Sequence, residues 1–178
     1  MSTAAGRSWP RIRQGVAGDA GPAAEVHCSS ALIAYADIFP ATATKPTPES
    51  LTPGWATLLG SPDASVLVAE PADDSGELVG TVALLSDPEP DTDLLLSRLY
   101  VRPDWWGSGL GSDLHWSAIA ASRELGAGRL ALWVLEANER ARAMYERWGW
   151  SLVPGRTFAN EPPTIVDVRY QLDLNRPC

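Results

Sequence analysis

The stretch LLLSRLYVRPDWWGSGLGS, residues 94–112, decides the fold of this chain. It begins as an apolar run typical of a central strand, stops at Pro103, and continues through alternating glycines. A helix is expected next, because apolar residues recur at helical spacing: Leu110, Leu114, Ala118, Ala121 and Leu125. A glycine loop that leads into a helix exposes backbone N–H groups where the helix dipole favours anions. The stretch therefore predicts a binding site for phosphate groups.

A second segment, NERARAMYERWGW at residues 138–150, predicts another helix. Asn138 is a suitable N-cap residue, and Gly149 stands just past the expected helix end. Tyr145 falls on the face that is expected to be buried, where a tyrosine is ordinarily part of the core. From the residues alone, both Asn138 and Tyr145 have a structural interpretation.

Together the two segments resemble the GCN5-related N-acetyltransferase (GNAT) superfamily. Its motif A corresponds to WGSGLGSDL at residues 106–114, and its motif B to N..A...YERWGW at residues 138–150. The resemblance implies an α/β fold with a single mixed, mostly antiparallel central sheet flanked by helices. It further implies that an acetyl group passes from acetyl-CoA to an amine by direct attack in a ternary complex. Acetyl-CoA is then a cosubstrate, and no metal is expected.

The resemblance also implies which residues form the site. The pyrophosphate of CoA is expected against residues 107–112, and the pantetheine arm along the strand backbone at Leu99 and Val101. Tyr145 is the expected catalytic acid, with its hydroxyl facing the CoA sulfur. The complete set of expected cofactor contacts is Leu99, Tyr100, Val101, Gly107, Ser108, Gly109, Leu110, Gly111, Ser112 and Asn138.

Two positions depart from the superfamily pattern. Trp106 stands where an arginine or glutamine is usual, which should weaken one side-chain contact to phosphate because backbone N–H groups make most of the others. Ser97 stands where many relatives have a glutamate, with Leu95 two residues earlier. Since an alkyl amine arrives protonated, a base is still required, and serine cannot serve alone. A water chain from Ser97 to Glu136 or Asp93 is one hypothesis, and the base remains open.

The rest of the chain predicts alternating strands and helices. Strands are expected near residues 11–16, 65–70, 77–85, 94–101, 129–135 and 165–174. A helix capped by Asp19 is expected to run to about Tyr35, and residues 40–54 to form a loop with at most a short helix near 49–59. Trp133, Trp105 and Trp106 could wall a pocket or belong to the core.

We expect one domain over residues 1–178. Residues 1–8 should be disordered, 9–97 should form the acceptor side, 98–152 should hold the two cofactor motifs, and 153–178 should form C-terminal strands. The start of the chain lacks the apolar stretch of a signal peptide, and no run approaches the ~20 residues of a membrane span, so a cytoplasmic protein is expected. Cys28 and Cys178 have no metal-ligand spacing and are interpreted as free thiols.

The net charge and its distribution along the chain indicate which classes of molecule the protein can bind. The net charge of −8 argues against a nucleic-acid partner, since phosphate neutralisation needs a basic face. Residues 1–97 hold 13 acidic and 4 basic residues, net −9, whereas residues 98–178 hold 9 and 10, net +1. The acidic first half favours a cationic small-molecule or peptidyl amine as the acceptor, and solvated acidic loops are the alternative. No membrane partner is expected, and the sequence leaves monomer and homodimer open.

Two other functions remain compatible with these residues. One is a non-catalytic acyl-CoA-binding sensor or regulatory domain on the same fold, which the missing glutamate favours and Tyr145 opposes. The other is an α/β domain that binds a different nucleotide. Consumption of acetyl-CoA with a panel of amines separates enzyme from sensor, and co-purification of CoA separates both from the third class.

Overall fold

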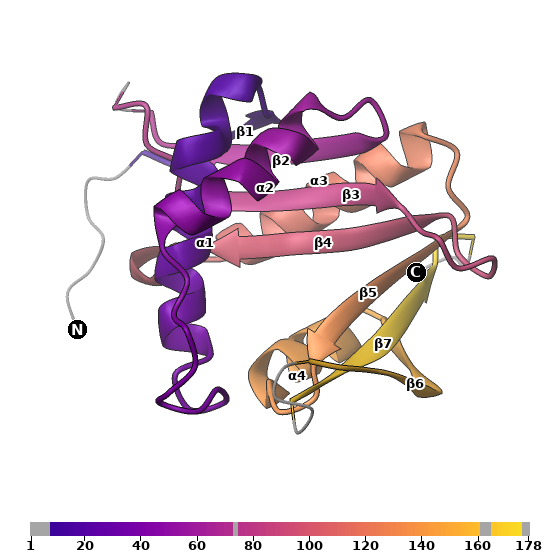
Figure 1. Ribbon diagram of the computed structural model, residues 1–178. Helices are drawn as coiled ribbons and strands as arrows, with labels where there is room; N and C mark the ends of the chain where they lie inside the picture. Colours follow the sequence, from indigo (N-terminus) through magenta and orange to yellow (C-terminus); the bar gives the residue numbers. More distant parts are fainter. Residues whose placement is uncertain (1–7, 73–74, 161–164, 176–178) are drawn as a thin grey trace.

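The computed structural model describes residues 8–72, 75–160 and 165–175, so residues 1–7 of the terminus predicted to be disordered lie outside the described part. Within that part, one sheet has the strand order β1-β2-β3-β4-β5-β7-β6 (Figure 1). Its strands are β1 (Arg11–Gln14), β2 (Ala64–Glu70), β3 (Gly80–Ser86), β4 (Leu94–Val101), β5 (Arg129–Leu135), β6 (Ser151–Ala159) and β7 (Val166–Asp173). The helices are α1 (Ala20–Ala34), α2 (Pro48–Gly60), α3 (Leu110–Glu124) and α4 (Glu139–Arg147).

The sheet is mixed and mostly antiparallel, as predicted. All neighbouring strands pair antiparallel except β4 and β5, which are parallel. These two strands pair only at Leu94 with Leu130 and Leu95 with Ala131, near the start of each strand. Beyond these pairs β4 and β5 diverge, and Figure 1 shows the V-shaped opening between them. This opening leaves backbone groups of both strands without a strand partner, in the middle of the sheet.

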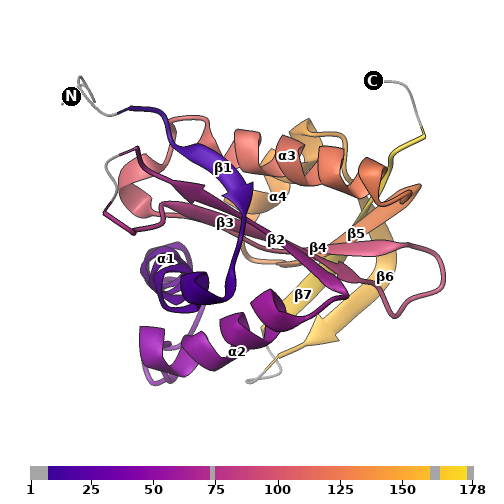
Figure 2. The same cartoon turned by 90° about the horizontal axis from the view of Figure 1, so that it is seen from above.

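Helices cover both faces of the sheet, and Figure 2 shows α1 and α2 on one face with α3 and α4 on the other. The larger core lies under α3, where Leu110, Leu114 and Ala118 are fully buried, as their helical spacing predicts. A second core lies under α1 and α2 around Trp55, whose side chain is also fully buried. The crossover from β4 through the glycine loop and α3 to β5 therefore seals one face of the sheet.

The region between residues 47 and 60 partly corrects the sequence prediction. Helix α2 spans Pro48–Gly60, close to the short helix that was allowed near residues 49–59, and it includes residues 48–54 of the expected loop. Thr47 and Ser50 form a reciprocal capping box, and Pro48 occupies the first helical turn, where a proline costs no hydrogen bond. The density of prolines and threonines concealed this helix start.

Asp19 also differs from its predicted role. It occupies the N-cap position of α1, but its side chain makes no hydrogen bond to that helix. Its carboxylate instead accepts hydrogen bonds from the Val16 N–H at 2.8 Å and from the Arg13 guanidinium at 2.7 Å and 3.0 Å. The charged partner outcompetes the helix amides, because ionic hydrogen bonds are the stronger ones.

At the end where β4 and β5 pair, polar side chains tie the loop before β4 to the other half of the sheet. Asp93 accepts hydrogen bonds from the backbone N–H groups of Gly128 and Arg129 at 2.8 Å and 2.9 Å. Arg169 of β7 forms an ion pair with Asp87, and both side chains are 1% exposed. The strand prediction placed Val168 and Tyr170 correctly on a buried face, but it gave no sign that Arg169 between them is buried too.

Cys28 is a free, buried thiol, as predicted, while Cys178 lies outside the described residues. Burial raises the pKa of the Cys28 thiol. Across the described residues, no helix combines the length and the apolar character that crossing a membrane requires.

Candidate functional site

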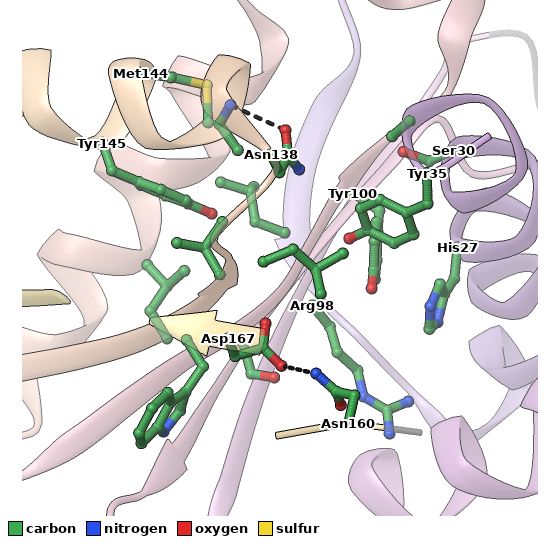
Figure 3. Close-up of a pocket in the computed structure, with 18 of the residues that line it drawn as sticks. His27, Ser30, Tyr35, Arg98, Tyr100, Asn138, Met144, Tyr145, Asn160 and Asp167 are labelled. Atoms are coloured by element: carbon green, nitrogen blue, oxygen red, sulfur yellow. Dashed lines mark hydrogen bonds between the residues drawn. The ribbon is translucent and has the colours of Figure 1, made fainter. Parts of the chain in front are cut away.

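A pocket of about 480 Å³ lies in the opening between β4 and β5. Residues 95–100 of β4 and 133–135 of β5 line its two strand walls, and residues of α1, α4 and β7 complete it. Figure 3 shows Asn138, Met144 and Tyr145 on one side, with His27, Ser30 and Tyr35 opposite. Strand β4 and helix α4, which were predicted from separate motifs, therefore line the same cavity. They do so because β4 and β5 separate there.

Tyr145 lines this pocket from α4. Its ring is edge-on to Trp148 and Trp150, with centroids 5.9 Å and 6.0 Å away, so aromatic packing fixes its direction. Figure 3 shows the hydroxyl pointing into the cavity. Burial raises the pKa of Tyr145, so the phenol stays protonated at neutral pH and can donate a hydrogen bond or a proton. Tyr145 is thus part of the core and also lines the pocket, and its catalytic role stays a prediction.

Asn138 is the N-cap of α4, as predicted, whereas its contact with the cofactor stays a prediction. Its side-chain oxygen accepts a hydrogen bond from the Ala141 N–H at 3.2 Å, which caps α4. The same residue lines the pocket, and Figure 3 draws it at the cavity edge. Since the cap uses the amide oxygen, the amide NH₂ group is left to donate to a ligand.

The glycine loop forms the start of α3, as the sequence predicts. Gly107 and Gly109 have positive φ angles of 77° and 107°, a conformation that other residues adopt at a cost. Ser112 and Asp113 donate their amides to the Gly109 carbonyl at 2.9 Å and 3.1 Å. Among the described residues, the amides of Gly107, Gly109 and Gly111 have no hydrogen-bond acceptor. Free alternating amides at a helix N-terminus form a suitable cradle for an anion.

Trp106, which departs from the superfamily pattern, has contacts of its own at the end of β4 and with α4. Its indole N–H donates a hydrogen bond of 2.6 Å to the Val101 carbonyl, so the ring lies back against the end of β4. The guanidinium of Arg140 lies 4.7 Å from the centre of that ring. The basic side chain of Arg140, in the first turn of α4, therefore lies over Trp106. Trp106 is the loop position where the superfamily usually has an arginine or a glutamine. Sequence reasoning missed Arg140, although it stands two residues after the motif asparagine.

The three predicted contacts on β4 differ in their surroundings. Leu99 and Tyr100 line the pocket, whereas Val101 does not, and its carbonyl is already bound by Trp106. Opposite Val82 of β3, Arg98 and Leu99 form a bulge, where the register shifts and Arg98 has a φ of 53°. A bulge turns side chains away from the regular alternation of a strand. Here Arg98, Leu99 and Tyr100 all contribute to the lining of the pocket, although Leu99 packs against the core under α3 and Tyr100 against the core under α1 and α2.

The carboxylates considered for the base do not reach the pocket. Asp93 is held by the amides of Gly128 and Arg129 at the paired end of β4, and neither Asp93 nor Glu136 lines the cavity. Ser97 and Leu95 do line it, as expected. Asp167 of β7, which sequence reasoning overlooked, lines the same cavity and accepts a hydrogen bond of 2.8 Å from Asn160. The strand alternation that predicted β7 placed Asp167 on its less apolar face, and this was the available signal.

The tryptophans that could wall a pocket have different positions, and a histidine of α1 joins the pocket lining. Trp133 is part of the pocket wall, whereas Trp105 is buried and lies outside it, in the core. His27 of α1 stacks on Tyr100 with centroids 4.0 Å apart. Burial, with a contribution from the Arg98 charge, lowers the pKa of His27 to about 4, so this imidazole is neutral at pH 7.

A model of the Acetyltransferase (GNAT) family matches residues 32–150, a range that includes the glycine loop, Asn138 and Tyr145. The chain belongs to this family. The family performs acyl transfer, and the resemblance drawn from the two motifs is thereby confirmed. No group of acidic, histidine and cysteine side chains in the described residues is arranged to hold a metal ion.

Curated relatives share part of the chain. An uncharacterized N-acetyltransferase of Mycobacterium tuberculosis is 32% identical over 104 residues, which cover 58% of this chain and 64% of the relative. A mycothiol acetyltransferase of Propionibacterium freudenreichii is 41% identical over 93 residues, which cover 51% of this chain and 28% of that protein. The chain thus spans less than two thirds of the curated relatives it matches.

Solved structures share the whole fold. The PaiA N-acetyltransferase of Thermoplasma acidophilum in complex with coenzyme A matches with a TM-score of 0.69 and 19% identity, over 93% of this chain and 99% of that one. The ribosomal-protein-S18-alanine N-acetyltransferase of Escherichia coli matches with a TM-score of 0.69 and 16% identity, over 95% and 96%. At these identities the likeness establishes the fold.

Proposed function

We propose that this protein transfers the acetyl group of acetyl-CoA to an amine by direct attack, with Tyr145 as the acid for the departing thiolate. The observation that carries the proposal is the opening between β4 and β5, into which the Tyr145 hydroxyl points. The family membership supports acyl transfer, and the coenzyme A complex of a structural neighbour supports the choice of donor.

The chain offers a separate group for each part of acetyl-CoA. The free amides of Gly107, Gly109 and Gly111 suit the pyrophosphate, and the Arg140 guanidinium adds the charge that Trp106 lacks. The unpaired edge of β4 at Leu99 suits the amides of the pantetheine arm, which can pair with it as a strand would. The Val101 carbonyl already accepts a hydrogen bond from Trp106, so it is engaged within the protein.

The chemistry balances with the residues present. The amine nitrogen forms a bond to the thioester carbonyl carbon, and the C–S bond breaks. The ammonium form of the amine first loses one proton, which passes to the medium. After attack the thiolate takes the Tyr145 proton, the nitrogen gives up a second proton that restores the phenol, and the third proton stays on the amide nitrogen. Asp167 is the carboxylate in the cavity to which an ammonium proton can pass, directly or through water. Since a thioester is a reactive electrophile, orientation and proton transfer suffice.

A matched pair of glycines tests the cofactor site. Gly109 and Gly126 flank α3 at opposite ends, both have positive φ, and neither is crowded. Gly109→Ala and Gly126→Ala should lower stability similarly, by about 1 kcal/mol. Calorimetric titration should show weaker CoA binding for Gly109→Ala alone. Equal affinities for the two variants would mean that the loop is only a turn.

Thiol release from acetyl-CoA with a panel of amines tests the activity. Turnover with at least one amine is expected. Tight CoA binding with no turnover for any amine would favour the sensor function, and no CoA binding would favour a domain for another nucleotide.

A further inference from the structure

Arg98 is held in the pocket wall by a strained backbone position. It lies in the bulge of β4 with a φ of 53°, where a non-glycine residue is uncommon. The Thr81 hydroxyl donates a hydrogen bond of 3.1 Å to the Arg98 carbonyl and fixes this conformation from β3. Strain that neighbouring residues hold in place is concentrated at functional sites in proteins. Here its effect is to put an arginine side chain on the cavity wall (Figure 3).

The guanidinium of Arg98 has no anionic partner. Its carbon atom lies 4.9 Å from the centre of the Trp55 ring, and Gly54 leaves room for it, since a Cβ there would lie 3.4 Å from Nη2. Among the described residues, it forms no ion pair and no hydrogen bond. Its half-buried position lowers the pKa of Arg98, yet arginine stays charged at any physiological pH. A half-buried charge without a partner is unfavourable until an anion binds.

The neighbouring groups add no anion of their own. The rings of His27 and Tyr100 are stacked. Both side chains are neutral at pH 7, because burial lowers the pKa of His27 and raises the pKa of Tyr100. His27 Nδ1 is buried without a partner among the described residues. The one carboxylate among the described lining residues is Asp167. The cavity therefore presents one cation and one anion to its contents.

Most acidic side chains that suggested a cationic acceptor lie elsewhere. Glu70 pairs with Arg11 and Arg13, Glu77 pairs with Arg102, and Asp87 pairs with Arg169. Among the described residues between positions 46 and 97, no acidic side chain lines the cavity. These three carboxylates are thus engaged in ion pairs away from the cavity, and the groups that line the cavity are the ones that face the acceptor.

We propose that the acceptor is an amino acid or a similar small amine that carries a carboxylate, bound by Arg98 through its carboxylate and facing Asp167 with its ammonium group. This inference rests on the proposed function. The arginine fork matches a carboxylate with two parallel hydrogen bonds, and one cation beside one anion complements a zwitterion. The acetylated product is an N-acetyl amino carboxylate, formed by the balanced step given above.

Paired substrates test the proposal without any variant. The twenty amino acids and their carboxamides differ only in the group that Arg98 would bind. We expect the wild-type protein to use at least one amino acid with a kcat/KM tenfold or more above that of its amide. Amides used as well as acids would overturn the proposal. Aminophosphonates used better than amino acids would replace the carboxylate by a phosphonate and overturn it as stated.

Variants separate recognition from a structural role. Arg98→Gln should raise KM for the amino acid at least tenfold and leave kcat/KM for the amide within twofold, and Arg98→Lys should retain part of the preference. Equal losses for acid and amide would show that Arg98 only supports Trp55 and would contradict the proposal. CoA affinity should be unchanged in both variants, which confirms that the cofactor site is intact.

Failure of the proposed function has a different signature. If no amine is acetylated, calorimetric titration of the CoA-bound protein with the same acid and amide pairs tests recognition alone. Binding of acids in preference to amides, lost in Arg98→Gln, would uphold the inference for a non-catalytic protein. No preference would overturn it.

Discussion

The two ends of the junction between β4 and β5 are built in opposite ways. At the paired end, Asp93 accepts hydrogen bonds from two backbone amides at the start of β5, and the buried Arg169–Asp87 pair joins β7 to the loop before β4. At the open end the strands are not paired. There the Arg98 guanidinium has no ion pair, and the amides of Gly107, Gly109 and Gly111 have no hydrogen-bond acceptor, among the described residues. At the paired end, charged and polar side chains join the two halves of the sheet, although Nε and Nη1 of the buried Arg169 have no hydrogen-bond partner among the described residues. At the open end, the free groups lie where a ligand would bind.

This difference shows how one sheet can be rigid and still bind a molecule in its middle. Unpaired backbone and charged groups are unfavourable inside a protein, so they persist only where the surrounding structure holds them. The paired end, the two cores and the bulge at Arg98 provide that support. Breaking the paired end should therefore reduce stability, whereas changes at the open end should reduce binding or turnover.

The largest effect is expected from Asp87→Ala. This change leaves the Arg169 guanidinium buried without its carboxylate, and losing one partner of a buried pair costs about 3–5 kcal/mol. Urea unfolding should show this loss. The matched exposed change, Glu89→Ala, removes only the surface pair with Arg156 and should cost less than about 1 kcal/mol. Similar stabilities for both variants would mean that the buried pair does not support the paired end.

Tyr145→Phe should act on turnover alone. Loss of the phenol proton should lower kcat by roughly ten- to a thousand-fold with little change in acetyl-CoA affinity. Tyr170→Phe is the matched control, because it removes a hydroxyl that is bonded to Glu146 and Arg142 outside the cavity. Its kcat should stay within about twofold, so a normal rate for Tyr145→Phe would remove Tyr145 from the mechanism.

Acid should destabilise the protein in two pH ranges. Burial lowers the pKa of both His27 and His115 from 6.5 to about 4, so the unfolded chain binds more protons than the folded one between these values. Stability should therefore be complete above pH 6.5 and fall toward pH 4, by about 1.4 kcal/mol per pH unit for each histidine. Hydrogen bonds lower the pKa of Asp93 below 3.8, so the paired end should contribute further losses only in stronger acid.

The variant His115→Gln tests how much His115 contributes to this pH dependence. His115 Nε2 accepts a hydrogen bond of 2.9 Å from the Trp150 indole, and a glutamine oxygen can accept there without titrating. The free energy of unfolding, measured in urea from pH 7 to pH 5, should depend less steeply on pH in this variant. An unchanged slope would show that His115 does not titrate as described.

The smallest effect is expected from Arg140→Gln. Arg140 is exposed, and its guanidinium lies over Trp106 beside the glycine loop, so its loss should weaken CoA binding by about three- to tenfold. The loss should shrink as salt screens the charge. Arg147→Gln, at the other end of the same helix, should leave affinity unchanged. Equal affinities for both variants would mean that Arg140 does not replace the basic residue missing from the loop.

Sequence reasoning succeeded where local patterns decide the structure. The bounds of β4 and β5 are those predicted, and α3 begins at Leu110 as its apolar spacing implies. Helix α2 was predicted only as a short helix near residues 49–59 within a loop, because proline usually marks loops, although it favours the first helical turn. The bounds of β6 were not predicted, since its exposed alternation is weak and only C-terminal strands in general were expected.

The site was predictable only where its residues lie in motifs. Asn138 and Tyr145 were found because their spacing is fixed within one helix. Arg98, Asp167 and His27 come from three elements that meet only after the sheet has formed and opened. No spacing in the sequence encodes that meeting. The bulge that turns Arg98 toward the cavity likewise depends on the register with β3.

Backbone amide NMR during titration with acetyl-CoA tests the central claim, that the open end of the junction is the cofactor site. We expect large shift changes at Leu99, Asn138 and residues 107–112, with small ones at Leu94 and Leu130, which pair at the closed end. Shift changes confined to other surfaces, or none at saturating acetyl-CoA, would contradict it.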